Sequence, residues 1–153
     1  MNKTLLNETK NNKKVFICDE TLKHMEAHPD VSINHVKEAI KNISLDGGFF
    51  MESVDMGRVV GKDHCIYVSQ ENWSNVKMVK RPNRKGSTPM INLPPVETTL
   101  LTIGICMDDD GLYTIFTAFY GAKAPKEPWD TNSDSERSES EKFWASHALS
   151  MEE

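Results

Sequence analysis

The residues of this chain with the clearest chemical potential are cations, a hydroxyl and an imidazole, all in its second half. Positions 80–85 read Lys-Arg-Pro-Asn-Arg-Lys, which gives four cations and no acid. Thr117 follows in an apolar, β-rich run, and His147 follows shortly after Trp144. A guanidinium binds phosphate through two parallel N–H donors, and an imidazole titrates near neutral pH. These residue types suit a site that handles phosphate esters.

Three histidines are candidates for a general acid or base in such a site: His24, His64 and His147. His24 and His28 stand four residues apart in a predicted helix, a spacing that can also hold a metal ion. No HExxH pattern accompanies them and no third ligand is apparent, so the sequence predicts no metal site and no cofactor. A structural role stays open for His64 at the start of a predicted strand, and for His147 packed on Trp144.

The net charge is −5, and it is distributed unevenly along the chain. Segment 75–85 carries five cations and no acid, whereas segment 130–141 carries five acids and Arg137 as its one cation. Cations bind nucleic acid by neutralising phosphates, and an acidic segment favours a basic partner. Because Pro82 and Gly86 are turn residues, the basic run can also be read as a solvated loop.

Composition places the chain among ordinary globular proteins. Its 153 residues are 38% hydrophobic and 27% charged, which predicts a single domain over 14–153 after a flexible N-terminus at 1–13. No apolar run approaches the roughly 20 residues that span a bilayer, and no signal peptide opens the chain. We therefore expect a cytoplasmic protein without a membrane partner. Three widely spaced cysteines, with no CxxC pair, are expected to be reduced and buried.

The first third of the chain after position 13 has helical patterns. Asp19 is a helix-capping residue, and Pro29 is expected to end the helix that follows it. In segment 32–43, apolar residues recur at spacings of three and four, which predicts a second, amphipathic helix that ends near Asp46-Gly47-Gly48.

The pattern then becomes that of strands. Several short apolar runs lie between 49 and 80, and the clearest pair, 98–107 and 112–120, flanks the turn signal Asp108-Asp109-Asp110-Gly111. An acidic, Pro- and Ser-rich connection follows at about 122–140, then a predicted helix within 140–150. The predicted fold class is α+β: two N-terminal helices followed by a twisted antiparallel sheet of about four to five strands and a short C-terminal helix.

This order of elements, with a central hairpin ending in Thr117-Ala118-Phe119, resembles the superfamily of small metal-independent RNases. That superfamily includes barnase, the EndoU nucleases, the anticodon-cutting colicins and the RelE toxins. The resemblance covers about residues 15–121. The run 81–84 and the ending 143–149 also look like a set of uncharacterised small bacterial proteins.

The resemblance implies a bacterial toxin that cleaves RNA by general acid/base attack of the 2′-hydroxyl on phosphate. It assigns catalysis to His147, His64, Thr117 and Arg81. Phosphate or RNA binding falls to Arg84, Lys80, Lys85 and Trp144. The implied partners are RNA and a cognate antitoxin or immunity protein.

A non-enzymatic interaction module is the alternative. In that hypothesis the sheet presents an adaptable surface and the acidic tail docks a basic partner. Eight methionines and the Pro128-Trp129 element favour it, because Met and Trp are frequent in contact surfaces. The two hypotheses differ in whether Arg81, Arg84, Thr117 and a histidine line one cleft.

Overall fold

The computed structural model describes residues 2–27, 31–82 and 84–151, without the side chains of 24, 26 and 27. In this description the chain forms two compact units. The first consists of Met1–Gly61 and Glu97–Lys123, and the second of Lys62–Val96 and Ala124–Glu153. The prediction of one domain over 14–153 stays a prediction.

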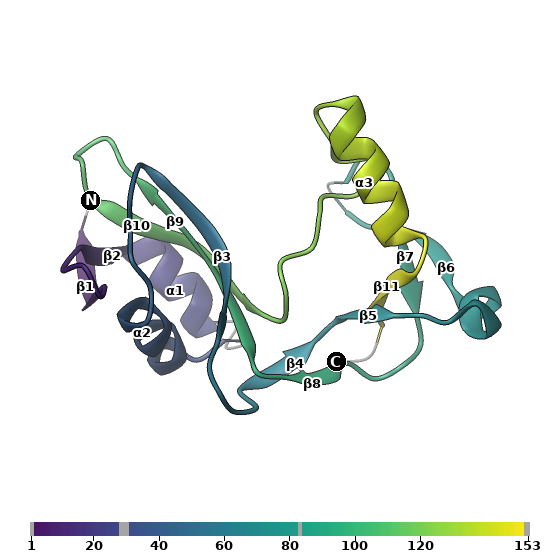
Figure 1. The fold of residues 1–153 in the computed structure, drawn as a ribbon, viewed down its shortest axis with the longest axis horizontal. Coiled ribbons are helices and arrows are strands. Elements are labelled where there is room, and N and C mark those ends of the chain that lie inside the picture. Colours follow the sequence, from purple (N-terminus) through teal and green to yellow (C-terminus); the bar gives the residue numbers. More distant parts are fainter. Residues whose placement is uncertain (1, 28–30, 83, 152–153) are drawn as a thin grey trace. The chain divides into compact units, whose positions relative to one another are not determined.

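The first unit is built on a five-stranded sheet in the order β1-β2-β10-β9-β3. Its strands and helices are β1 (Lys3–Glu8), β2 (Lys14–Cys18), α1 (Asp19–Ala27), α2 (Ile33–Lys41), β3 (Phe49–Asp55), β9 (Leu100–Met107) and β10 (Tyr113–Tyr120). β10 pairs antiparallel with β9 and parallel with β2. Both helices lie against one face of this sheet (Figure 1).

The alternation of side chains between the two faces of β9 explains how the core of the first unit forms. Leu101, Ile103 and Ile105 are fully buried and belong to one apolar cluster. Successive strand residues point to opposite faces, so these three share the face toward the helices. Val36 and Ile40 of α2 are also fully buried in the cluster, as their spacing of four residues predicts.

The turn between β9 and β10 is held by Asp108. Its Oδ1 atom accepts the backbone N–H of Asp110 at 2.9 Å and of Leu112 at 3.0 Å. Gly111 has φ of +76°, a conformation that glycine adopts without steric cost. The predicted hairpin of 98–120 is therefore confirmed, with its strands paired antiparallel as β9 and β10.

The second unit is built on a four-stranded sheet in the order β5-β11-β7-β6. Its elements are β5 (Cys65–Tyr67), the 3₁₀ helix η1 (Gln70–Asn75), β6 (Lys77–Lys80), β7 (Ser87–Ile91), the 3₁₀ helix η2 (Pro128–Asp130), α3 (Asp134–Trp144) and β11 (His147–Ser150). β11 pairs antiparallel with β5 and parallel with β7. β4 (Gly61–Asp63) and β8 (Val96–Thr98) form a two-stranded sheet in the segments where the chain passes between the units.

The predicted fold class, α+β with two N-terminal helices before one antiparallel sheet and a short C-terminal helix, is wrong. The described residues hold eleven strands in three sheets, so strands dominate. A hairpin of β1 and β2 precedes the helices, because pairing with β2 holds residues 3–8, whose own sequence pattern is weak. Two of the strand pairings are parallel, so the sheets are mixed rather than antiparallel.

The end of the chain also differs from the expected helix within 140–150. α3 begins at Asp134, because Ser133 caps it: the Oγ atom of Ser133 accepts the N–H of Glu136 at 3.2 Å. The helix stops at Trp144, and His147–Ser150 then form β11, in which Ser150 is aligned with Ile91. The pattern Ser-x-x-Glu at 133–136 was the sequence signal for this earlier start.

Candidate functional site

The basic run lies at the turn between β6 and β7. Lys80 pairs with Ser87, so residues 81–86 form the loop between the two strands. Lys80, Arg84 and Lys85 are exposed. Gly86 packs tightly against the ring of Trp129, because a Cβ atom at position 86 would lie 2.4 Å from that ring. The close contact at Gly86 thus fixes this end of the loop, next to the exposed cations Arg84 and Lys85.

Arg81 differs from these exposed cations. Its Nε atom donates to the hydroxyl of Thr88 at 3.2 Å, and its Nη2 atom lies 3.9 Å from Oε1 of Glu127. Thr88 is fully buried and Glu127 is 8% exposed, whereas about a third of the Arg81 side chain is exposed. Arg81 therefore joins the loop to a buried acid that comes from a distant part of the sequence.

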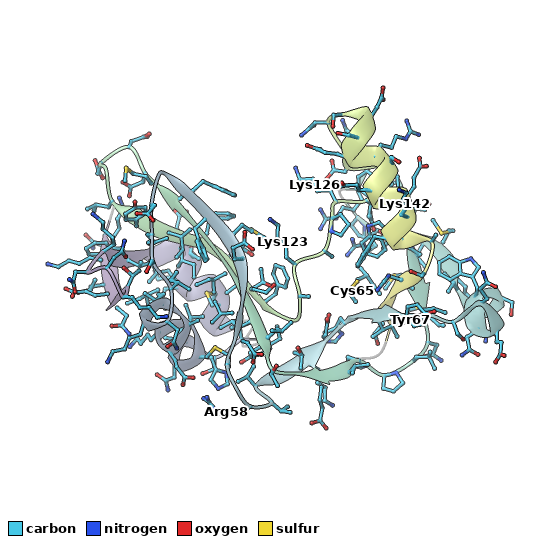
Figure 2. The ribbon with its side chains drawn as sticks, viewed as in Figure 1. Arg58, Cys65, Tyr67, Lys123, Lys126 and Lys142 are labelled. Atoms are coloured by element: carbon cyan, nitrogen blue, oxygen red, sulfur yellow. The ribbon has the colours of Figure 1, made fainter. Side chains whose placement is uncertain are left out.

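His147 is the first residue of β11 and sits among other rings. Its Nδ1 atom lies 2.9 Å from the carbonyl oxygen of Phe143 and 3.1 Å from Oγ of Ser146. A carbonyl can only accept, so Nδ1 carries the proton and Nε2 of the neutral ring is an acceptor. The imidazole stacks on Phe143 with centroids 3.9 Å apart and meets the edge of Tyr67 at 5.8 Å. Tyr67, which Figure 2 labels, is 69% exposed.

The other predicted catalytic residues lie elsewhere. His64 is exposed just before β5, and its backbone carbonyl accepts the N–H of Ser150 at 2.7 Å. Thr117 is a half-buried residue of β10 in the first unit, opposite Gly104 at a β-bulge. The side chain of His24 and all of His28 lie outside the described residues. Of the eight predicted site residues, all except Thr117 belong to the second unit.

Trp144 anchors α3. The indole is 9% exposed, donates its N–H to the carbonyl oxygen of Pro125 at 3.2 Å and packs edge-on against Phe143. Ser140, one turn earlier, is fully buried and donates to the carbonyl oxygen of Lys126. These two contacts tie α3 to residues 125–129, a segment that we call the strap. Figure 2 labels Lys126 on the strap and Lys142 on α3.

The outer surface of α3 is acidic. We define this acidic surface as Asp134, Glu136 and Glu139 of α3 together with Asp130, the last residue of η2, all of them exposed. Among the cations of α3, Arg137 donates to Glu141 at 3.2 Å and Lys142 lies in the last turn. The acids before Glu141 therefore keep their charge unbalanced along the first part of the helix.

A cavity of about 230 Å³ lies at the start of α3 and is lined by Trp129, Asn132 and Arg137 among others. It contains none of the predicted site residues. In the described parts of the chain, no three His, Cys, Asp or Glu side chains are grouped as a metal site would require. No helix of the described residues is long and apolar enough to cross a membrane.

The cysteine thiols have different environments. Burial, with a smaller contribution from the charge of Asp63, raises the pKa of Cys65 to about 12. The hydroxyl of Thr21 and its backbone N–H, at the start of α1, lower the pKa of Cys18. All three thiols are free and half-buried.

Glu127 is the site residue that sequence reasoning missed. It falls within the acidic, Pro- and Ser-rich connection that the sequence predicts at about 122–140. The signal that could have found it is the pair of flanking indoles, Trp129 and Trp144. Large apolar rings close to one acid indicate a segment that packs, and therefore a carboxylate that needs a cation.

Comparisons with known proteins identify a solved structure with a similar fold. No family model matches the chain, and no curated protein matches it. Among solved structures, a conserved hypothetical protein from Toxoplasma gondii is similar, with a TM-score of 0.54 and 11% identity. The alignment covers 79% of this chain and 84% of that chain. At this identity the likeness concerns the fold alone, so the function has to be argued from the chain's own residues.

Proposed function

We propose that this protein is a non-enzymatic interaction module that docks a basic partner through the acidic surface of α3. The observation that carries the proposal is the way α3 is mounted. Buried Ser140 and Trp144 fix one side of the helix to the strap, and the acids on its remaining surface are exposed. A helix that exposes carboxylates without cation partners offers charge complementarity to a basic partner, which gives specificity and speeds association.

The environments of the predicted catalytic residues also favour this function over catalysis. Arg81 already pairs with Glu127, and His147 is held by a carbonyl and by two rings. A general base needs access to the proton that it removes, and an arginine that stabilises a phosphorane needs its donors available. His147 is engaged in ring packing, and Glu127 places a competing negative charge beside Arg81.

Partner capture with charge variants tests the proposal. The α3 variant carries Asp130→Asn, Asp134→Asn and Glu139→Gln, which leaves Glu136 and its capping contacts intact. The control carries Asp46→Asn, Glu52→Gln and Asp109→Asn, three exposed acids of the first unit. We expect immobilised wild type and control to capture the same basic protein, and the α3 variant to lose it. Identical captured proteins for both variants would contradict the proposal.

A metal-independent RNase is the second candidate, and one observation favours it. The exposed cations Lys80, Arg84 and Lys85 border the same four-stranded sheet that carries His147. Its test is inducible expression of wild type beside Arg81→Ala, Thr117→Ala and His147→Ala, with the integrity of total RNA as readout. Fragmented RNA with wild type, and intact RNA with folded variants, would establish the nuclease. Intact RNA with wild type and with every variant, at good expression, would rule out the nuclease.

A further inference from the structure

The contact between Arg81 and Glu127 is poorly made for a structural ion pair. The distance from Nη2 to Oε1 is 3.9 Å, well beyond hydrogen-bond length. Oε1 of Glu127 is the one buried side-chain oxygen or nitrogen in the described residues without a hydrogen-bond partner. A buried carboxylate that lacks hydrogen bonds loses hydration without full compensation. The pair therefore does little to stabilise the fold, and its presence calls for another reason.

Arg81 is oriented as an anion-binding group would be. Its Nε atom is fixed by the hydroxyl of Thr88, which sets the plane of the guanidinium. Its Nη2 atom lies on the side of Glu127, and about a third of the side chain reaches solvent. Carboxylates and phosphates are the two anions that the planar guanidinium fork matches. Glu127 thus supplies the carboxylate to a group that accepts phosphate equally well.

The surroundings of Arg81 add charge of the right sign. Lys80, Arg84 and Lys85 are exposed, and the loop has no acid of its own. Among the described residues, no carboxylate forms an ion pair with any of these three. A phosphate at Arg81 would therefore lie in a loop that carries only cations, with Glu127 as the competing acid.

Glu127 can leave without unfolding the sheet. The strap that carries it is attached by side chains to backbone carbonyls: Trp129 to Ser87, Ser140 to the strap's Lys126, and Trp144 to the strap's Pro125. The strands β6 and β7 are held separately by their own ladder. Displacement of the acid therefore breaks no strand pairing.

We propose that Arg81 is the centre of a phosphate-binding site that Glu127 occupies and closes. Glu127 and a phosphate group exclude each other, because two anions at one partly buried guanidinium repel strongly. The ligand is a phosphate group, either free or within the phosphodiester backbone of a nucleic acid. Neither Arg81 nor Glu127 belongs to the acidic surface, so the site extends beyond the docking function and is tested independently.

The test is to titrate the full chain with inorganic phosphate and, separately, with a labelled single-stranded oligoribonucleotide. Four proteins are compared: wild type, Glu127→Gln, the double variant Glu127→Gln with Arg81→Lys, and Glu71→Gln. The last removes an exposed acid of η1 in the same unit and serves as the charge-matched control. Circular dichroism establishes that each protein is folded, and the near-isosteric Glu→Gln and the charge-conserving Arg→Lys changes are chosen to keep them so.

We expect Glu127→Gln to bind at least one ligand about tenfold more tightly than wild type, the effect of about 1.4 kcal/mol of relieved repulsion. Glu71→Gln should bind like wild type, and the double variant should lose the gain, because lysine lacks the fork. Gain with phosphate alone identifies a free phosphate, and gain with the oligoribonucleotide alone identifies a phosphodiester. Equal affinities of wild type and Glu127→Gln, or a gain that survives Arg81→Lys, would overturn the proposal.

Discussion

The two units of this chain are stabilised in different ways. Among the described residues, the core cluster of the first unit contains fifteen buried apolar residues and that of the second contains four. Four of the six buried polar residues in the described chain, in contrast, belong to the second unit: Thr88, Glu127, Ser140 and Ser150. Apolar burial is non-directional and scales with area, whereas each buried polar contact needs one particular partner.

This difference has a consequence for function. In the first unit the large apolar cluster holds the sheet and helices together through many contacts. In the second unit, single hydrogen bonds hold α3 and the strap. Elements attached by a few contacts have low local stability and are the ones that can rearrange on binding. The acidic surface lies mainly on α3, and Glu127 of the proposed phosphate site lies on the strap.

The largest expected difference between the two units concerns their apolar cores. Ile103→Ala removes a fully buried side chain from the large cluster and should lower the free energy of unfolding by about 2–5 kcal/mol. The matched change in the second unit is Ile91→Ala, in the cluster of four, which should cost less because its surroundings can collapse around the gap. Denaturant unfolding measures both. Equal losses would contradict a division between a large core and a small one.

The two units also differ in the reactivity of a cysteine thiol, that of Cys18 in the first and that of Cys65 in the second. With a pKa of about 12, Cys65 has about a thousandfold less thiolate at neutral pH than a thiol at 9.0. Cys18, whose pKa is lowered by Thr21, should be alkylated much faster in the native protein. Peptide mapping after timed iodoacetamide treatment measures both rates, and in denaturant the two should become equal. A native Cys65 that reacts as fast as Cys18 would refute the burial argument.

A single polar anchor of the second unit can be removed by Trp144→Phe. The change keeps a ring against Phe143 but deletes the N–H donor and leaves the carbonyl of Pro125 unbonded, which should cost about 1–3 kcal/mol. Trp73→Phe is the control, because this half-buried indole packs on the small cluster without a hydrogen bond between its N–H and another described residue. Thermal unfolding should show a clearly larger loss for Trp144→Phe. Similar losses would mean that ring area, and not the hydrogen bond, anchors α3.

The smallest effect concerns Asp108 in the first unit and depends on pH. Lys3 and the turn's N–H groups lower the pKa of Asp108 from 3.8 to about 2. A carboxyl with a lowered folded-state pKa stabilises the fold above its unfolded pKa, and that stabilisation is lost as pH falls from 3.8 toward 2. Asp108→Asn should therefore be less stable than wild type at neutral pH and should converge with it near pH 2. A stability difference that is the same at both pH values would contradict this assignment.

The sequence predicted elements whose signals are local. The hairpin around Asp108–Gly111 and the helix α2 have strong turn and periodicity signals, and both are present. β11 was missed because its neighbours are distant in sequence: it lies between β5 and β7. β1 was missed because its own pattern is weak and pairing with the adjacent β2 holds it in place. Non-local pairing overrides weak local propensity, so short strands of this kind leave little trace in a single sequence.

The candidate site was predicted in part. The basic run stood out by charge alone, and seven of the eight predicted residues belong to the unit that carries it. The sequence did not indicate which charged side chains lie next to each other in space. Nothing in the spacing of Arg81 and Glu127, 46 positions apart, indicates that they meet. The proximity of Glu127 to Arg81 is therefore evident only from the structure.

The most direct measurement is the affinity of the purified chain for a lysine-rich peptide at low and high salt, by fluorescence anisotropy. The wild type and the first-unit control (Asp46→Asn, Glu52→Gln, Asp109→Asn) should bind alike. The α3 variant (Asp130→Asn, Asp134→Asn, Glu139→Gln) should bind about tenfold more weakly, since each exposed ion pair contributes about 0.2–1 kcal/mol. High salt should remove the difference. Equal affinity of the two charge-matched variants at low salt would contradict docking through α3.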